Sequence, residues 1–210
     1  MIYAENILLC VAVPLLLSML FIRGQARRFV LAFVVGMLVC LLAAYVSGYL
    51  HYLIDWTEKD VRVFLSPVVE ELMKLLPMLI VLLLLNPEDE GLLLMAVGLG
   101  AGFATFENSC SLLTGAVSSL PYVLVRGMAV GVMHIVSVAA LSIGIITARR
   151  FRALSLPALT GAFSLSVNFH GLYNLLVSAP GASAYVGYAL PLLAAGALYL
   201  PYRAFRGKES

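Results

Sequence analysis

Residues 66–77 read Ser-Pro-Val-Val-Glu-Glu-Leu-Met-Lys-Leu-Leu-Pro, which places two adjacent carboxylates and a lysine at the head of an apolar run that continues to Leu85. A charged side chain at the centre of a membrane helix costs about 2.5–3.5 kcal/mol on insertion scales. Such charged groups lie inside the apolar runs of this chain at Glu70, Glu71, Lys74, Glu107 and Arg126. They must be paired, neutralised or hydrated, so we expect them to share one polar cavity.

The composition of the chain is that of an integral membrane protein. Of its 210 residues, 62% are hydrophobic and 11% are charged, and the mean hydropathy is +1.03. A soluble core cannot bury so much apolar surface. The length allows a single membrane domain over residues 1–210 and no separate soluble domain. The net charge is only +2, and the basic residues cluster in short loops, which argues against a nucleic-acid partner.

The pattern of apolar segments predicts an all-α bundle of about seven transmembrane helices. Helices are expected because lipid offers the backbone no hydrogen-bond partners, and the alternating pattern of a barrel is absent. The segments of spanning length cover about residues 6–22, 29–52, 64–85, 91–113, 121–147, 156–178 and 183–203.

Basic residues predict the orientation of this bundle. They gather in the first predicted loop, the fifth predicted loop and the C-terminal tail, which all lie on one side of a seven-helix protein. The positive-inside rule makes that side cytoplasmic, with the N-terminus outside and the C-terminus in the cytoplasm. The residues concerned are Arg23, Arg27, Arg28, Arg149, Arg150, Arg152, Arg203, Arg206 and Lys208.

This topology brings polar residues of different helices to one depth. Glu70, Glu107 and His170 lie about six to eight residues from the outer edge, or roughly 9–12 Å at a rise of 1.5 Å per residue. Arg126 lies at a similar depth and His134 lies deeper. We therefore expect one site in the outer half of the bundle.

Each motif also has a purely structural interpretation. Glu70 and Glu71 precede Lys74 by four and three residues, so both acids can approach the lysine on one helix face as an ion pair. Glu107 could pair with Arg126, and His170 and Asn174, four residues apart, could bridge helices by hydrogen bonds. Taken together, the set favours a hydrolytic site.

Amide hydrolysis requires a base that activates water, donors for the oxyanion and an acid for the leaving amine. Glu70 or Glu71 could act as the base, and a histidine and an asparagine could supply donors. A Gly-x-Ser-x-Gly motif is absent, which argues against a serine nucleophile. A His-Glu-x-x-His motif is absent too. Zn²⁺ could still be held from separate helices by His134, His170, Glu70 and Glu107, so metal dependence stays open.

The ordered set of motifs resembles the PrsW family of intramembrane proteases, which is related to the CAAX-prenyl endopeptidases and bacteriocin-processing membrane proteins. The motifs cover residues 64–178 and are Glu70-Glu71-x-x-Lys74, Phe103-x-x-x-Glu107-Asn108, Arg126 with His134, and His170-x-x-x-Asn174. In the wider clan the second motif ends in histidine, and Glu107 at this position is typical of the PrsW branch.

The resemblance implies an endopeptidase with a CAAX-protease-like core that cuts a membrane-embedded protein or peptide. In this interpretation Glu70 and Glu71 activate water, and His170 and Asn174 are the oxyanion donors. Lys74 and Arg126 support the site, and His134 is typical of the family. The family is known for the first cleavage of a membrane-bound anti-sigma factor on its extracytoplasmic side. Two other hypotheses stay open on the residues alone: a proton- or ion-coupled transporter and a non-catalytic scaffold.

Overall fold

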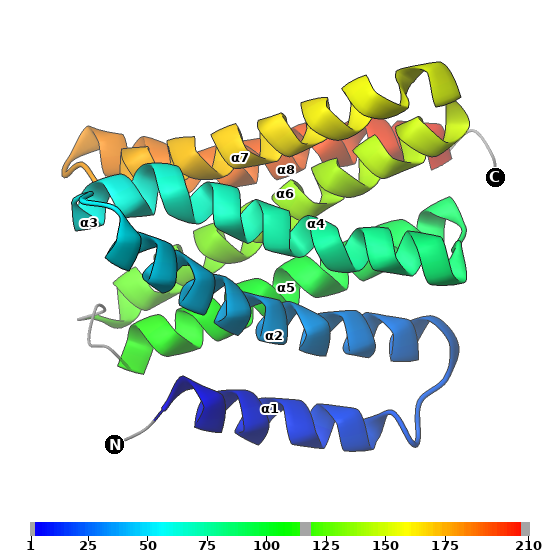
Figure 1. Ribbon diagram of the computed structural model, residues 1–210, viewed down its shortest axis with the longest axis horizontal. Helices are drawn as coiled ribbons and strands as arrows, with labels where there is room; N and C mark the ends of the chain where they lie inside the picture. Colours follow the sequence, from blue (N-terminus) through cyan, green and yellow to red (C-terminus); the bar gives the residue numbers. More distant parts are fainter. Residues whose placement is uncertain (1–2, 114–118, 207–210) are drawn as a thin grey trace.

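The computed structural model describes residues 3–113 and 119–206, and within them every regular element is helical (Figure 1). This confirms the all-α bundle and its seven long helices. The long helices are α1 (Ala4–Ser18), α2 (Gly24–Leu53), α4 (Ser66–Leu85), α5 (Asp89–Leu113), α6 (Leu120–Arg150), α7 (Ser155–Val177) and α8 (Ala182–Arg206). Short pieces join them at α3 (Glu58–Asp60), the π-helical turn η1 (Val61–Leu65) and the 3₁₀ turn η2 (Arg152–Leu154).

The protein is an integral membrane protein. Among the described residues four helices, α2, α5, α6 and α8, are long and apolar enough to cross a membrane by length and composition. Helices α4 and α7 are of similar length, at 20 and 23 residues, and carry polar residues of the predicted site. Helix α1 is apolar but has only 15 residues.

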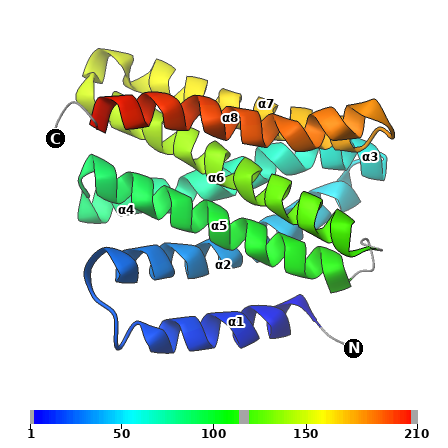
Figure 2. The ribbon, with the colours of Figure 1, turned by 180° about the vertical axis from the view of Figure 1, so that it is seen from behind.

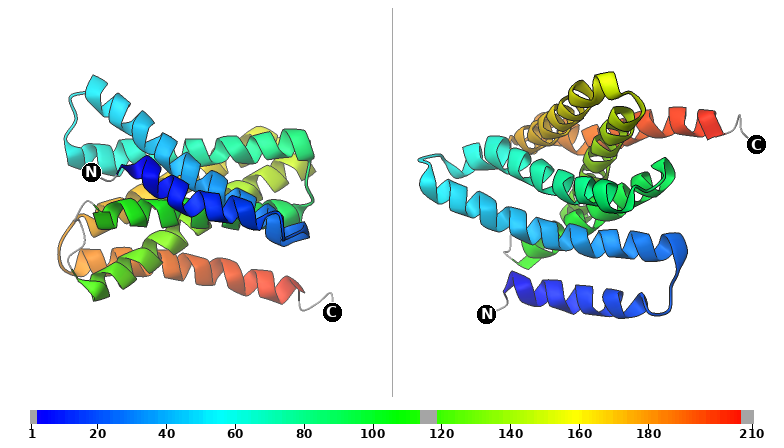
Figure 3. Two further views of the ribbon diagram at one scale, coloured as in Figure 1. Left: turned by 90° about the horizontal axis from the view of Figure 1, so that it is seen from below. Right: turned by 45° about the vertical axis from the view of Figure 1, so that its right-hand side comes forward.

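The helices run roughly along one common direction, and α1 begins at the end of the bundle opposite to the one where α8 finishes (Figure 1). Helix α1 begins at the end that holds α3, and α8 finishes at the other end (Figure 1). Seen from behind, α6 crosses between α5 and α8 (Figure 2). Helix α1 lies at the edge of the bundle against α2 (Figure 3).

The core lies where α2, α4, α5 and α6 meet. It is built from large apolar side chains that are almost fully buried, among them Met37, Leu99, Phe103 and Val138. Aromatic and aliphatic side chains of this size make the many short contacts that hold apolar helices together when water is not the competing solvent.

Glycines of α5 let its neighbours approach closely. A Cβ on Gly102 would overlap the carbonyl oxygen of Phe33 on α2. A Cβ on Gly100 would lie 2.8 Å from the carbonyl oxygen of His134 on α6. Both approaches are too close for a real side chain, so α5 can sit between α2 and α6 only because it lacks side chains there.

Candidate active site

Glu70 lies in the first turns of α4, directly after an irregular turn that was not predicted from the sequence. The π-helical turn η1 runs directly into α4, and Pro67 follows it. In the π pattern the carbonyl of Arg62 would bond to the N–H of residue 67, which proline does not have. Asn174 of α7 takes its place and donates from Nδ2 to the Arg62 oxygen at 2.9 Å. The bond attaches α7 to the turn that leads into Glu70, and the Ser-Pro pair was its only sequence signal.

Behind this turn, Lys74 holds a fully buried acid and a fully buried histidine together. Glu71, Lys74 and His134 each have 0% of their surface exposed. The Nζ atom of Lys74 lies 2.7 Å from Glu71 Oε1 and 2.7 Å from His134 Nδ1. It also lies 4.2 Å from the centroid of the Phe103 ring. The predicted pairing of Glu71 with Lys74 therefore forms, and it joins α4 to α6.

Glu107 continues the network from the other side of His134. Its Oε2 lies 2.6 Å from His134 Nε2, and its Oε1 accepts from Arg126 at 3.2 Å. Arg126 also donates to Asn108 Oδ1 at 2.5 Å. The pair of Glu107 and Arg126 expected from the sequence is thus present, but it is one part of a longer chain of polar contacts.

Glu70 and His170 face each other without a direct hydrogen bond. His170 Nδ1 lies 2.8 Å from Glu71 Oε1, whereas His170 Nε2 lies 3.8 Å from Glu70 Oε2. Among the described residues, Glu70 Oε2 and Glu71 Oε2 are buried carboxylate oxygens without a hydrogen-bond partner, and Glu70 Oε2 is the one that faces His170 Nε2. Buried carboxylate oxygens are rarely left unpaired because their desolvation is costly. The gap between the two side chains therefore points to a water molecule or a ligand.

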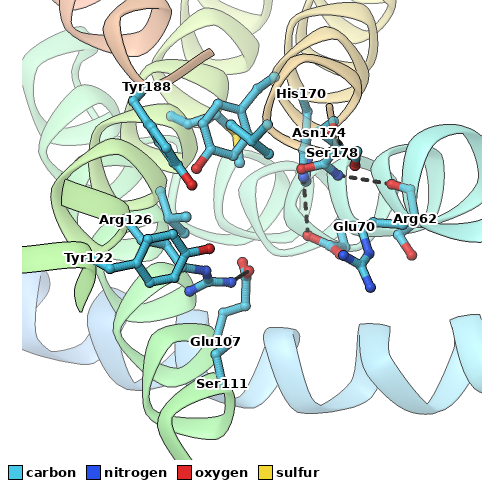
Figure 4. Close-up of a pocket in the computed structure, with 15 residues that line it drawn as sticks. Arg62, Glu70, Glu107, Ser111, Tyr122, Arg126, His170, Asn174, Ser178 and Tyr188 are labelled. Carbon is cyan, nitrogen blue, oxygen red and sulfur yellow. Dashed lines mark hydrogen bonds and ion pairs between the residues drawn. The ribbon is translucent and has the colours of Figure 1, made fainter. Parts of the chain in front are cut away.

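A polar cavity of about 420 Å³ opens beside this gap. Glu70, Glu107, Arg126, His170 and Asn174 all line it, from four different helices (Figure 4). Polar residues from separate helices therefore meet at one cavity, as the sequence predicted. The remaining members of the predicted set, Glu71, Lys74 and His134, lie behind the cavity and do not line it.

The cavity also has lining residues that the sequence did not predict, among them Arg62, Tyr122 and Tyr188. Tyr122 and Tyr188 form an edge-to-face pair with ring centroids 6.4 Å apart, and both line the cavity together with Arg62 (Figure 4). The two tyrosines lie near the start of α6 and α8, where aromatic residues commonly mark the membrane surface. Their positions in the sequence could have indicated tyrosines at the membrane surface, but only the fold shows that the two rings meet at the cavity.

The donor chemistry of the site fits a metal ion. Glu70, His134 and His170 each offer a ligand atom, and these atoms lie within 4.8 Å of one another. The unpartnered Glu70 oxygen and His170 suit a metal best, because metal-ligating histidines usually donate their second N–H to a carboxylate such as Glu71. His134 differs, since its second nitrogen faces the ammonium group of Lys74.

The chain matches the family model described as "PrsW family intramembrane metalloprotease" over residues 25–197. This range contains every residue of the buried network and of the cavity described above. No curated protein and no solved structure matches the chain.

Proposed function

Because the chain belongs to the PrsW family of intramembrane metalloproteases and is therefore an intramembrane protease, we propose that it cuts a membrane-anchored protein in the outer half of the bilayer. The observation that carries this proposal is the unpartnered oxygen of Glu70, which lies 3.8 Å from His170 Nε2 at a polar cavity. A carboxylate in such a place has a free acceptor for a proton from water. An anti-sigma factor is the type of substrate that the family resemblance favours.

Glu70 is the general base in this proposal. It is the member of the Glu70–Glu71 pair that lines the cavity, whereas Glu71 is enclosed by Lys74 and His170. Glu70 takes a proton from the attacking water, and the same group can return it to the leaving amine. Glu71 keeps Lys74 and His170 in place.

Charge on the tetrahedral intermediate is stabilised from α7 and α6. The amide of Asn174 uses one N–H for the Arg62 carbonyl, which fixes its position and leaves a second N–H as a donor. Arg126 lies across the cavity and is held by Glu107 and Asn108. Donors fixed in advance are effective because they need no reorganisation during the reaction. A divalent metal held by Glu70 and His170 would instead supply Lewis-acid polarisation of the scissile carbonyl, with Glu70 as a ligand rather than the base.

The test is cleavage of a peptide with a single membrane anchor by purified protein in lipid nanodiscs. We expect Glu70→Gln to lower the rate by about 10²–10⁴-fold, because the variant keeps the shape of the side chain and loses the base. Glu58→Gln is the matched control, since Glu58 is exposed in α3 at the same end of the bundle. Cleavage by Glu70→Gln at the wild-type rate would refute the assignment of the base. Running both variants with and without a chelator tests the metal separately.

A further inference from the structure

The contacts of Lys74 assign the protons of the buried network. An ammonium group has three donors and no acceptor. Its neighbours here are Glu71 Oε1 at 2.7 Å, His134 Nδ1 at 2.7 Å and the face of the Phe103 ring at 4.2 Å. A ring face receives a cation favourably, so each donor of Lys74 has a suitable partner. His134 Nδ1 must therefore accept a hydrogen bond.

The opposite edge of His134 leads to the same assignment. A neutral imidazole carries its proton on one nitrogen, and Nδ1 is the acceptor, so the proton is on Nε2. Nε2 lies 2.6 Å from Glu107 Oε2, and a carboxylate that also accepts from Arg126 is a good partner for this N–H. In this tautomer His134 has no lone pair left at Nε2, and it does not line the cavity.

The contacts of His170 place its proton on the other ring nitrogen, Nδ1. Its Nδ1 lies 2.8 Å from Glu71 Oε1, the same oxygen that accepts from Lys74. A carboxylate paired with an ammonium group can only accept, so Nδ1 of His170 carries the proton. In the neutral ring Nε2 then keeps a lone pair. This atom faces Glu70 Oε2 at 3.8 Å, and both residues line the cavity.

We propose that the two buried histidines are held in opposite tautomers. The contacts with Lys74 and Glu107 keep the proton of His134 on Nε2, and the contact with Glu71 keeps the proton of His170 on Nδ1. His170 alone therefore offers a lone pair to the cavity. His170 Nε2 then orients the water that Glu70 deprotonates, or binds a metal with Glu70. His134 is a positioning residue that orients Glu107. Two roles expected from the sequence change accordingly. His170 is an acceptor rather than the oxyanion donor that the resemblance implies, and His134 is not the metal ligand that its residue type allowed. Their catalytic meaning rests on the proposed function, but the tautomers do not.

Nitrogen NMR of the wild-type protein tests the tautomers directly. The chain has three histidines, so ¹⁵N-histidine labelling in nanodiscs gives three pairs of ring signals. His51→Gln identifies the pair of the His51 ring, whose Nε2 donates to the backbone carbonyl oxygen of Trp56. We expect one buried ring protonated only on Nε2 and the other only on Nδ1. The same nitrogen protonated in both rings, or two protons on either buried ring, would overturn the proposal. This measurement needs neither substrate nor metal, so a protein without proteolytic activity would refute the proposed function and leave this result standing.

Amide substitutions at the two histidines give a second, functional readout. The amide nitrogen of glutamine can replace an Nε2–H donor, and that of asparagine is nearer to the position of Nδ1. We therefore expect His134→Gln to retain at least about tenfold more cleavage than His134→Asn, a typical effect for a supporting partner. In Zn²⁺ titrations we expect His170→Gln to lose at least about tenfold in affinity and His134→Gln to stay near the wild type. An equal loss of Zn²⁺ affinity in both variants would make His134 a ligand and contradict the proposal.

Discussion

At the scale of single residues, the buried network contains an ion pair without exposed surface, Lys74 with Glu71. Lys74 and Glu71 are both without exposed surface, and each depends on the other for a charged partner. Removing one member of a buried pair typically costs about 3–5 kcal/mol because the other charge stays buried, whereas removing both can be nearly neutral. The pair therefore contributes to stability only as a unit.

We predict that Lys74→Met lowers the free energy of unfolding by about 3–5 kcal/mol and that Glu71→Gln/Lys74→Met regains most of this loss. The amide introduced by Glu71→Gln would still present an oxygen to Nδ1 of His170, so the second substitution removes the stranded charge without removing the acceptor. Denaturant titration in mixed micelles measures the difference. Lys59→Met is the control, because Lys59 is exposed in α3. A double variant as unstable as the single one would contradict the argument.

At the scale of helices, the catalytic geometry depends on how closely α5 and α6 approach. Gly100 of α5 lies against the backbone of His134, the residue that joins Lys74 to Glu107. A methyl group there would meet the His134 carbonyl oxygen at 2.8 Å, and backbone cannot rotate away as a side chain can. A shift of α6 would also move Arg126, which belongs to this helix, and would change the contacts of Glu107 with Arg126 and His134.

We predict that Gly100→Ala lowers the cleavage rate by about 10²-fold, because a misplacement of catalytic groups by about 1 Å can have an effect of that size. Gly131→Ala is the matched control on α6, since among the described atoms nothing lies within 4 Å of its added Cβ. The control should be as stable as the wild type or more stable, because alanine is the better helix former by about 1 kcal/mol. Comparing cleavage and thermal stability of the two variants separates the effects. Equal activity in both would mean that the close packing is not required.

The same scale shows why the sequence predicted some parts of the site and not others. The rise per residue along a helix gives the depth of a side chain, which is why the meeting of Glu70, Glu107 and His170 could be predicted. The direction in which each side chain points around the helix axis could not be predicted, because apolar residues lie on every side of most of these helices. The sequence therefore could not separate Glu70, which lines the cavity, from Glu71, which lies behind it. The π-turn and its bond to Asn174 depend on a tertiary partner and could not be foreseen either.

At the scale of the whole molecule, the side of the membrane that the cavity faces decides which substrates can reach it. The cavity is lined by Arg62 before α4 and by Ser178 after α7, so it lies at the end of the bundle where α8 begins. The opposite end carries Arg149 and Arg150, which both contact Asp89 at the start of α5. The distribution of basic residues predicts that this second end is cytoplasmic.

We predict that a cysteine at Ala182 is labelled by a membrane-impermeant maleimide in intact cells, and that a cysteine at Arg152 is labelled only after permeabilisation. Both positions are exposed and lie at opposite ends of the bundle, so each serves as the control for the other. The background would replace Cys10, Cys40 and Cys110, the three native cysteines, after activity has been checked. The reverse pattern of labelling would place the cavity toward the cytoplasm. A protease with that orientation would still use Glu70, but it could not cut a segment exposed on the outer surface, so the substrate class would have to change while the chemistry remained.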